Sequence, residues 1–483
     1  MEPIVLKKLL KPGNRALIVG LGKSGISAVR FLLELGLEVS VSEGGRAAQL
    51  DGEVLQWLQE KGVKLETGGH TSEFFCSADS ILVSPGIPLE LPALTAARRA
   101  GIPIFGEMAL APEFLRTPVV AVTGTNGKST VTSLIGEICR AAGKKVFVGG
   151  NIGVPLTDYL SGPQDAEVAV LEISSFQLDT AGEFRPRVAV LLNISPDHLD
   201  RYDGFEAYAA SKLSIVRHQL PADTLVYNAD DPVIRQQLGK LPLRSGTLPF
   251  SVEKPPAGGA FLQGDRITLE GFGPAGTARE GYFLAGTGLR GVPNGLNAMA
   301  AALAARAIGC PPDAVTTGMK NFKTLPHRLS LVAERAGVKF YDDSKATNEG
   351  AAASALQGFE GPVILIAGGR GKGGDYSILA SAVRGKVKAM LLLGEASSRM
   401  AEVFGKLTRV ERVKDMGEAV SRSITLAESG DVVLLAPACA SFDMFRSYAH
   451  RGETFRQAVL EAASTIGGVE MTGSIIDCEA GLS

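Results

Sequence analysis

An apolar run ending at Val122 leads into a polar turn with a lysine and two hydroxyl residues. Residues 123–130 read Thr-Gly-Thr-Asn-Gly-Lys-Ser-Thr, and a helix-like pattern follows. This order predicts a strand, a phosphate-binding loop and a helix N-terminus, whose N–H groups and dipole attract anions. The Lys128 ammonium can reach outer phosphates, and the Ser129 hydroxyl can bind Mg²⁺. The general P-loop has a glycine where this chain has Val122, so the pattern indicates a shorter variant of that loop.

A second glycine motif lies near the start of the chain. Residues 20–25 read Gly-Leu-Gly-Lys-Ser-Gly between an expected strand, 15–20, and a helix pattern that runs through Leu35. Glu43 follows about twenty residues later, as in dinucleotide-binding domains, where an acid holds a ribose hydroxyl. Because this loop binds a pyrophosphate whatever the rest of the ligand is, an NAD-linked oxidoreductase is one interpretation.

Three further candidate residues lie near expected strand ends or on an expected helix. Glu172 ends an apolar strand, 168–173, and His198 follows another, 188–194. Side chains at the carboxyl ends of parallel strands face the crevice where ligands bind. Mg²⁺ prefers oxygen ligands, so Asp197 and Asp200 are alternatives to His198 in a metal site. A lysine beside such metal ions, such as Lys212 on its expected helix, would be repelled as an ammonium and could react with CO₂.

Three polar loops follow expected strands in the last third of the chain. They span residues 341–348, 368–375 and 437–443, and two of the strands are the apolar runs 363–367 and 432–436. Parallel strands would bring these loops to one edge of one sheet. Their lysines and hydroxyls suit a dicarboxylate ligand.

Length and composition favour a soluble α/β enzyme. The 483 residues suggest three domains of about 150 residues each. Apolar residues make up 45%, and a net charge of −2 gives no indication of a polyanion-binding surface, although it is compatible with local basic pockets. The five scattered cysteines suit a reduced cytoplasmic compartment, and no apolar run is long enough to span a bilayer. We therefore expect a cytoplasmic monomer without nucleic-acid or membrane partners.

Alternating apolar strands and helical patterns predict parallel sheets in three domains. We expect a Rossmann-like domain over 1–106 and a central P-loop ATPase-like domain over 107–324. A second Rossmann-like α/β domain should cover 325–483, with a loose tail from about 467. Residues 241–291 are expected to form short antiparallel strands at the edge of the central sheet, closed by a helix over 296–308.

In this order the motifs resemble those of the Mur ligase and folylpolyglutamate synthase superfamily, over nearly the whole chain except the tail. The run Asp-Ser-Lys-Ala-Thr-Asn, 343–348, resembles the members that add D-glutamate. The resemblance implies an ATP-dependent ligase that joins D-glutamate to UDP-N-acetylmuramoyl-L-alanine through an acyl phosphate, in peptidoglycan precursor synthesis. A relative that adds another amino acid or folate glutamates, and the NAD-linked enzyme, are the alternatives.

The resemblance also implies roles for individual residues. The catalytic residues would be Lys128, Glu172, His198 and Lys212. Two Mg²⁺ ions would be held by Ser129, Glu172, His198 and Lys212 as a carbamate. ATP would be bound by Gly124, Thr125, Asn126, Gly127, Lys128, Ser129, Thr130, Asn294, Asn297, Arg328 and Asp343. The UDP-sugar would be bound by Gly22, Lys23, Ser24, Glu43, Ser84, Gly86, Asn151 and Ser174, and the amino acid by Lys345, Thr347, Lys372, Ser441, Phe442 and Tyr448.

Two positions depart from the family pattern. Pro293 stands where the family usually has a histidine, and Arg370 where it often has an acidic residue.

Overall fold

The computed structural model describes residues 6–272, 278–289 and 291–464. Its chain divides into two compact units. The first holds residues up to Ile194 together with Asp203–Phe322, and the second holds Ser195–Tyr202 together with residues from Lys323 on. The three domain ranges stay a prediction, and the expected tail from about 467 lies outside the described residues. Within those residues, no helix is long and apolar enough to cross a membrane.

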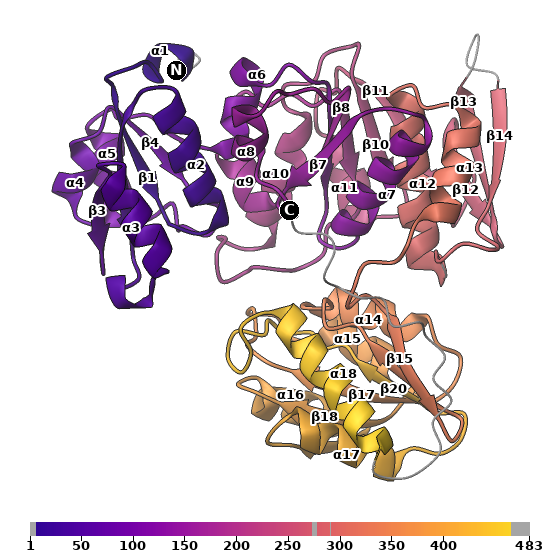
Figure 1. Cartoon of the computed structure of the whole chain (residues 1–483). Coiled ribbons are helices and arrows are strands. Elements are labelled where there is room, and N and C mark those ends of the chain that lie inside the picture. The colour runs from indigo at the N-terminus through magenta and orange to yellow at the C-terminus, as the bar shows by residue number, and fades with distance from the viewer. Residues whose placement is uncertain (1–5, 273–277, 290, 465–483) are drawn as a thin grey trace. The chain divides into compact units, whose positions relative to one another are not determined.

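The first sheet has five parallel strands in the order β3-β2-β1-β4-β5 (Figure 1). The predicted βαβ start is confirmed, because β1 and β2 pair in parallel on either side of α2. The strands are β1 Arg15–Val19, β2 Glu38–Glu43, β3 Lys64–Thr67, β4 Ser80–Val83 and β5 Ile104–Gly106. The helices of this part are α1 Leu6–Leu9, α2 Lys23–Glu34, α3 Gly52–Glu60, α4 Ser72–Cys76 and α5 Pro92–Arg99.

The second sheet has nine strands in the order β14-β13-β12-β11-β10-β9-β6-β8-β7. Its buried centre is apolar on both faces, as expected of parallel strands covered by helices. The strands are β6 Val119–Thr123, β7 Val146–Gly150, β8 Val168–Glu172, β9 Val188–Leu191, β10 Thr224–Asn228, β11 Gly246–Ser251, β12 Gly259–Gln263, β13 Arg266–Phe272 and β14 Ala278–Phe283. The helices are α6 Ala111–Phe114, α7 Lys128–Ala141, α8 Leu156–Ser161, α9 Ser175–Asp179, α10 Phe205–Leu213, α11 Pro232–Leu238, α12 Gly291–Ala307 and α13 Pro312–Asn321.

The edge of this sheet differs in one respect from the prediction. Strands β12, β13 and β14 are antiparallel, as expected, but β11 pairs in parallel with both β10 and β12.

The helix expected over 296–308 begins earlier, at Gly291, and therefore includes Pro293. A proline in the first turn of a helix removes no intrahelical hydrogen bond, which explains why this start is tolerated.

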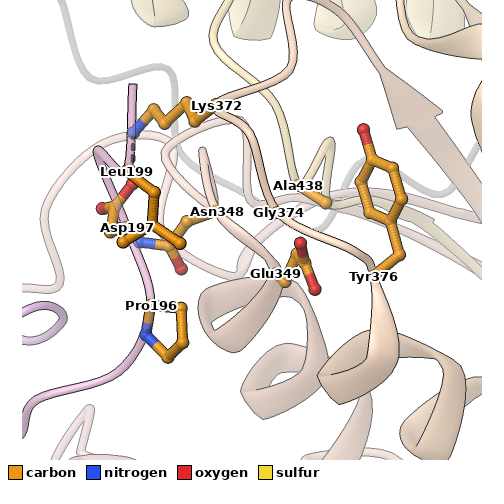
Figure 2. A pocket seen from close by; sticks show the side chains of 9 residues that line it. All are labelled: Pro196, Asp197, Leu199, Asn348, Glu349, Lys372, Gly374, Tyr376 and Ala438. Atoms are coloured by element: carbon orange, nitrogen blue, oxygen red, sulfur yellow. Dashed lines mark hydrogen bonds and ion pairs between the residues drawn. The ribbon is translucent and has the colours of Figure 1, made fainter. Parts of the chain in front are cut away.

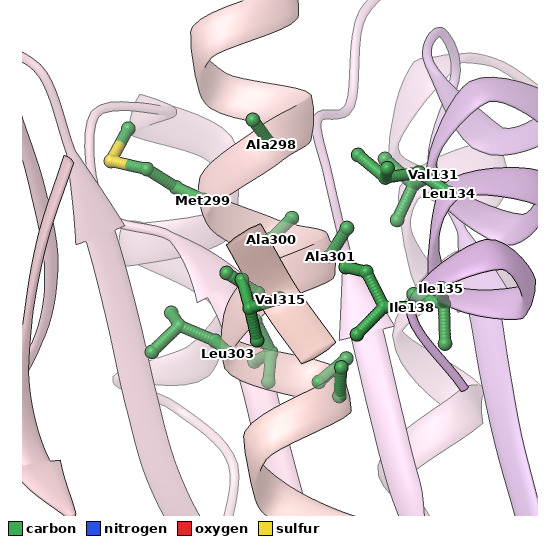
Figure 3. Close-up of a cluster of buried hydrophobic side chains, with 14 of the residues drawn as sticks. Val131, Leu134, Ile135, Ile138, Ala298, Met299, Ala300, Ala301, Leu303 and Val315 are labelled. Atoms are coloured by element: carbon green, nitrogen blue, oxygen red, sulfur yellow. The ribbon is translucent and has the colours of Figure 1, made fainter. Parts of the chain in front are cut away.

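Helices α7, α12 and α13 pack together in the first unit, and Figure 3 shows part of the buried cluster to which they contribute. Helix α12 is rich in buried alanine, and α7 presents branched side chains such as Ile138. A Cβ placed on Gly318 of α13 would lie 2.6 Å from the Cα of Ile138. The small residues therefore allow the helices to approach closely and form a dense core.

The third sheet lies in the second unit and has the order β15-β16-β20-β17-β18-β19. Among the residues that the structure describes, β15 and β16 pair antiparallel, and the other ladders of this sheet are parallel. Strands β16, β20 and β17 are neighbours, so the three polar loops do meet at one edge, as predicted. The strands are β15 Ser330–Arg335, β16 Val338–Asp342, β17 Val363–Gly368, β18 Val387–Leu393, β19 Arg409–Arg412 and β20 Val432–Leu435. The helices are α14 Glu349–Gln357, α15 Ser377–Val383, α16 Ser397–Phe404, α17 Met416–Leu426 and α18 Tyr448–Ser464.

Candidate active site

The loop between β6 and α7 has the geometry of a phosphate-binding site. Gly127 precedes α7 with a φ of +87°, and a Cβ there would lie 2.4 Å from the Asn297 Oδ1. The Lys128 Nζ folds back over the loop and donates to the carbonyl oxygens of Gly124 and Thr125, at 2.9 and 2.8 Å. The hydroxyl residues Ser129 and Thr130 follow in the first turn of the helix, where the N–H groups favour anions.

Asn193 holds this loop from the end of β9, a role that the sequence did not indicate. Its side-chain Oδ1 accepts the Asn126 N–H at 2.8 Å, and its Nδ2 donates to the Asn126 carbonyl at 3.0 Å. Its own carbonyl accepts the Thr125 N–H at 2.9 Å. Asn294, from α12, accepts a hydrogen bond of 3.4 Å from Asn297, which faces Gly127. The structure therefore brings the predicted loop and the α12 asparagines together.

Lys212 on α10 is the second lysine at this loop. Lys212 is only 2% exposed, whereas a lysine on a helix usually lies in solvent. Its Nζ donates to the Gly124 carbonyl at 2.9 Å and lies 4.7 Å from the centre of the Tyr208 ring. The Tyr208 hydroxyl is in turn 3.1 Å from the Thr125 Oγ1. Lys128 and Lys212 thus converge on one carbonyl oxygen of the phosphate loop.

Glu172 ends β8 with its carboxylate buried at 2% exposure. Its Oε1 accepts a 2.8 Å hydrogen bond from the Asn151 side chain, and its main-chain oxygen accepts the Asn151 N–H. In the described part of the chain, its Oε2 has no hydrogen-bond partner. A buried carboxylate oxygen without a partner is costly and fits a site for a cation.

The first glycine motif forms a tight turn at the end of β1. A Cβ on Gly25 would lie 2.0 Å from the Gly20 carbonyl, so the first turn of α2 packs directly on the loop. The Glu43 carboxylate accepts the Leu21 N–H at 2.7 Å and the Gly45 N–H at 2.8 Å. Ser84 donates to the Gly20 carbonyl at 3.1 Å. Glu43 and Ser84 therefore shape the loop that the sequence assigned to a pyrophosphate.

Contacts inside the first unit join this loop region to the central sheet. Lys23 donates to the Gly153 carbonyl at 2.7 Å, and Ser27 lies 2.6 Å from the Thr157 Oγ1. Thr157 also donates to Glu107, whose carboxyl is buried and has a pKa raised by that burial.

Ser174, which was also predicted to contact the UDP-sugar, caps α9 by accepting the Gln177 N–H.

In the second unit, Asp197 is the centre of a polar cluster. Lys372 donates to its Oδ1 at 3.1 Å, and Asn348 donates to its Oδ2 at 2.9 Å (Figure 2). His198, with a φ of +54°, lies next to it, and its Nε2 is 3.7 Å from the Asp197 Oδ2. Burial opposes ionisation of this carboxyl, but Lys372 and His198 outweigh it and hold its pKa below the usual value. Asp197, Asn348 and Lys372 line a pocket with Pro196, Leu199, Glu349, Gly374, Tyr376 and Ala438.

Arg451 on α18 braces two of the three loops, a role that no sequence pattern indicated. Its guanidinium is 1% exposed and donates to the Ser344 Oγ and carbonyl oxygen, at 3.0 and 2.9 Å. A third bond of 3.1 Å reaches the Cys439 carbonyl. Ser344 also donates to the Tyr448 carbonyl at 2.7 Å. The loops after β16 and β20 are therefore tied to the start of α18.

The remaining predicted residues lie on the same loops. The Lys345 Nζ lies 3.8 Å from the centre of the Tyr448 ring, whereas the Lys372 Nζ donates to Asp197. Asp343 is buried, and its Oδ1 accepts the Leu329 N–H at 3.3 Å next to Arg328. Burial raises the pKa of Asp343 to about 7, while Arg328 opposes this increase.

The exposure of the amino-acid-binding candidates differs. Ser441 is buried at 2% exposure, whereas Phe442 is 67% exposed. Thr347 is half-buried, and its N–H donates to the Lys345 carbonyl at 2.8 Å.

The candidates therefore fall into two groups. Glu172 and Lys212 lie in the first unit, and His198 and Lys372 lie in the second. No group of three or more His, Cys, Asp or Glu side chains placed to hold a metal ion occurs in residues 6–272, 278–289 and 291–464. The predicted metal ligands also include a serine hydroxyl and a lysine carbamate, which lie outside those four residue types.

Family models account for each part of this architecture. The Mur ligase MurD-like N-terminal domain matches residues 14–106, and the Mur ligase middle domain matches residues 122–305. The Mur ligase glutamate ligase domain matches residues 327–439. The chain therefore belongs to the Mur ligase family, whose members use ATP.

Curated relatives are similar over almost the whole chain. A protein of Syntrophotalea carbinolica is 42% identical, over 92% of this chain and 97% of its own length. A protein of Desulfotalea psychrophila is 44% identical, over 92% of this chain and 95% of its own. Both are named UDP-N-acetylmuramoylalanine–D-glutamate ligase.

A solved structure supports the fold. The MurF ligase of Thermotoga maritima in complex with ADP has a TM-score of 0.55 and 19% identity, over 94% of this chain and 96% of its own.

Proposed function

We propose that this chain is an ATP-dependent ligase that joins D-glutamate to UDP-N-acetylmuramoyl-L-alanine, with release of ADP and phosphate. Relatives with that name match 92% of the chain at 42% and 44% identity. The observation that supports the ATP chemistry most directly is the loop before α7, where the Lys128 ammonium folds back over the Gly124 and Thr125 carbonyl oxygens at the helix N-terminus. Such a loop favours a nucleoside triphosphate over a neutral substrate.

The reaction has two steps that each place like charges together. The alanyl carboxylate attacks the γ-phosphorus of ATP, forms an acyl phosphate and releases ADP. The amine of D-glutamate then attacks the acyl carbon, loses a proton and expels phosphate through a tetrahedral intermediate. The Lys128 ammonium and the N–H groups at the start of α7 offset the phosphate charge that both steps concentrate.

The residues at this loop fit Mg²⁺, and two ions are part of the proposal. The buried Glu172 Oε2, which has no partner in the described residues, is an oxygen ligand of the kind that Mg²⁺ prefers. Ser129, Glu172, His198 and a carbamate on Lys212 would hold the ions. Bound Mg²⁺ would neutralise phosphate charge during transfer. Asp197 and Asp200 are the alternatives to His198 as a ligand, because Mg²⁺ prefers oxygen.

Lys212 would carry its carbamate through reaction with dissolved CO₂. The neutral amine attacks the carbon of CO₂, one carbon–oxygen π bond opens, and a proton leaves the nitrogen. The product is an anion, which suits a position among metal ions better than an ammonium does. The buried position of Lys212 at the Gly124 carbonyl supports this assignment, since a solvated helix lysine would be exposed.

The first sheet would bind the UDP part of the acceptor. The turn at Gly22 leaves its backbone open to a pyrophosphate, and Glu43 and Ser84 hold that turn in shape. The proposed contacts are Gly22, Lys23, Ser24, Glu43, Ser84, Gly86, Asn151 and Ser174. The MurD-like family model over residues 14–106 favours this ligand over NAD.

The loops of the second unit would bind the amino acid. Lys372, Thr347 and Ser441 supply a cation and two hydroxyls for the two carboxylates of D-glutamate. Lys345, Phe442 and Tyr448 complete the proposed set, and Asn294, Asn297, Arg328 and Asp343 complete the ATP contacts. The enzyme would act as a monomer in the cytoplasm, where ATP and nucleotide-linked precursors are available, without nucleic-acid or membrane partners.

The test is ATP-dependent phosphate release with single omissions and an amino-acid panel. The proposal expects release only when the UDP-muramoyl-alanine, D-glutamate, ATP and Mg²⁺ are all present. L-Glutamate, lysine and diaminopimelate should support little release. Activity with lysine or diaminopimelate in place of D-glutamate would make the chain a different amino-acid ligase. Micromolar binding of NAD without binding of the UDP-sugar would refute the assignment of the first sheet.

A further inference from the structure

The glycine-rich loop after β17 carries Lys372 and is anchored at both ends. The Gly368 N–H donates to the Pro437 carbonyl at 2.9 Å, and Arg370 pairs with Ala440 through two bonds of 2.9 Å. At the other end, the Tyr376 carbonyl accepts the Ala380 N–H at the start of α15. Lys372 lies between these anchors. Its Nζ is held by the Asp197 carboxylate, and its backbone lies in the middle of the loop, where Gly374 follows two residues later.

Glu349, the first residue of α14, lies directly against that middle segment (Figure 2). A Cβ on Gly374 would lie 1.9 Å from the Glu349 Oε1 and 3.0 Å from its Cδ. Gly374 is not among the residues with a positive φ, so any residue could adopt its backbone conformation. Gly374 therefore lacks a side chain because the Glu349 carboxyl occupies that space. The neighbouring Gly373 differs, because its φ of +82° by itself favours glycine.

The Glu349 carboxyl also faces the end of the loop. The Tyr376 backbone N–H interacts with it, and Tyr376 is buried with a φ of +63°, which is unfavourable for a bulky residue. Burial raises the pKa of the Glu349 carboxyl, the Tyr376 N–H and Arg399 oppose this increase, and Asp375 and Asp197 add to it. Glu349 thus spans from Gly374 to Tyr376, on the side of the loop that faces the pocket.

We infer that Glu349 is a positioning residue that holds the loop of Gly374 and Tyr376 so that Lys372 is presented to the amino-acid substrate. The inference rests on the proposed function, because it concerns the amino-acid site of that ligase. Glu349 does not need to touch the substrate in this role. Its shape and its acceptor oxygen matter more than its charge.

Two substitutions at Glu349 separate these properties. Glu349→Ala removes the carboxyl that lies against Gly374 and faces the Tyr376 N–H, so the loop loses its support on that side and the KM for D-glutamate should rise about tenfold. The KM for ATP should stay within about twofold. Glu349→Gln keeps the shape and an acceptor oxygen, so it should restore the KM for D-glutamate to near the wild-type value. Glu360→Ala, which removes an exposed acid after the same helix, is the matched control and should change neither KM.

Gly374→Ala tests the contact from the other side. The new methyl group would displace the Glu349 carboxyl, so the KM for D-glutamate should again rise about tenfold in this variant. In the Glu349→Ala background the same methyl group meets no carboxyl. The double variant should therefore be no worse than Glu349→Ala alone, a strongly non-additive result.

The outcomes distinguish this inference from the proposed function. If the wild-type chain fails to use D-glutamate, the proposed function is wrong. If the wild type is active but Glu349→Ala keeps its KM for D-glutamate, the positioning role is wrong. Equal penalties from Gly374→Ala in both backgrounds would also overturn it, as would a Glu349→Ala variant whose KM values for ATP and D-glutamate rise together while its Tm falls.

Discussion

Stability should depend on pH through the buried carboxyl of Asp343, and Asp343→Asn should remove that dependence. Burial raises the pKa of this group to about 7, from an ordinary value of 3.8. The gap of about three pKa units corresponds to roughly 4 kcal/mol at full ionisation. Between pH 4 and 7 the folded state binds more protons than the unfolded state, so the free energy of unfolding falls as pH rises.

The magnitude follows from the surroundings of the carboxyl. Its Oδ1 accepts the Leu329 N–H, a bond that an asparagine oxygen keeps, so the variant loses little when the acid is neutral. Above pH 7 the wild type carries an anion in a buried site, which the nearby Arg328 relieves only in part. Relative to wild type, Asp343→Asn should therefore gain up to roughly 4 kcal/mol between pH 4 and pH 8.

Calorimetry of the full chain without nucleotide, from pH 4.5 to 8.5, measures this difference. The Tm of Asp343→Asn should rise relative to wild type by on the order of 10 °C across the range. Asp375→Asn is the control, because that carboxyl is exposed and its pKa is lowered by Ser377. Because this carboxyl is ionised in both the folded and the unfolded state over nearly all of this range, the Tm difference between Asp375→Asn and wild type should stay nearly constant. If the Tm difference between Asp343→Asn and wild type is also constant at all pH values, the carboxyl of Asp343 does not titrate as described.

Three other substitutions test the site. Lys128→Ala should reduce turnover roughly a hundredfold or more, with an unchanged Tm, and near-normal phosphate release would contradict the ATP assignment. Lys212→Ala should be nearly inactive, and ¹³C-bicarbonate should give a carbamate NMR signal in the wild type that this variant lacks; the same signal in both would exclude Lys212. Arg451→Met leaves two buried carbonyls without their donor, at about 1–3 kcal/mol each. Removing the buried cation offsets part of this cost, so urea unfolding should show that the free energy of unfolding falls by about 1–3 kcal/mol. An unchanged urea midpoint would refute the bracing role.

Local patterns were sufficient to predict the phosphate loop and its surroundings. The strand before Gly124 and the helix after Lys128 follow from an apolar run and a glycine turn, which are short-range signals. The three polar loops of the last sheet could be predicted to meet because parallel strands align their carboxyl ends. The parallel pairing of β11 was missed, because the alternation of apolar residues does not determine strand direction.

The residues that hold the site in shape could not be predicted. Arg451 is more than a hundred positions from Ser344, and a basic residue on a helix usually lies on its solvated face. Asn193 and Glu349 act through contacts that only the folded chain creates. Lys372 was predicted as a substrate contact, but its bond to Asp197, 175 positions away, had no sequence signal.

Mass spectrometry of the nucleotide-sugar product, together with the phosphate released, decides whether the chain is this ligase. The enzyme would be incubated with UDP-N-acetylmuramoyl-L-alanine, D-glutamate, ATP and Mg²⁺. We expect the acceptor to gain the mass of one glutamyl residue, and each gain to accompany the release of one phosphate. Phosphate release without a glutamyl adduct, or an adduct formed without ATP, would contradict this expectation.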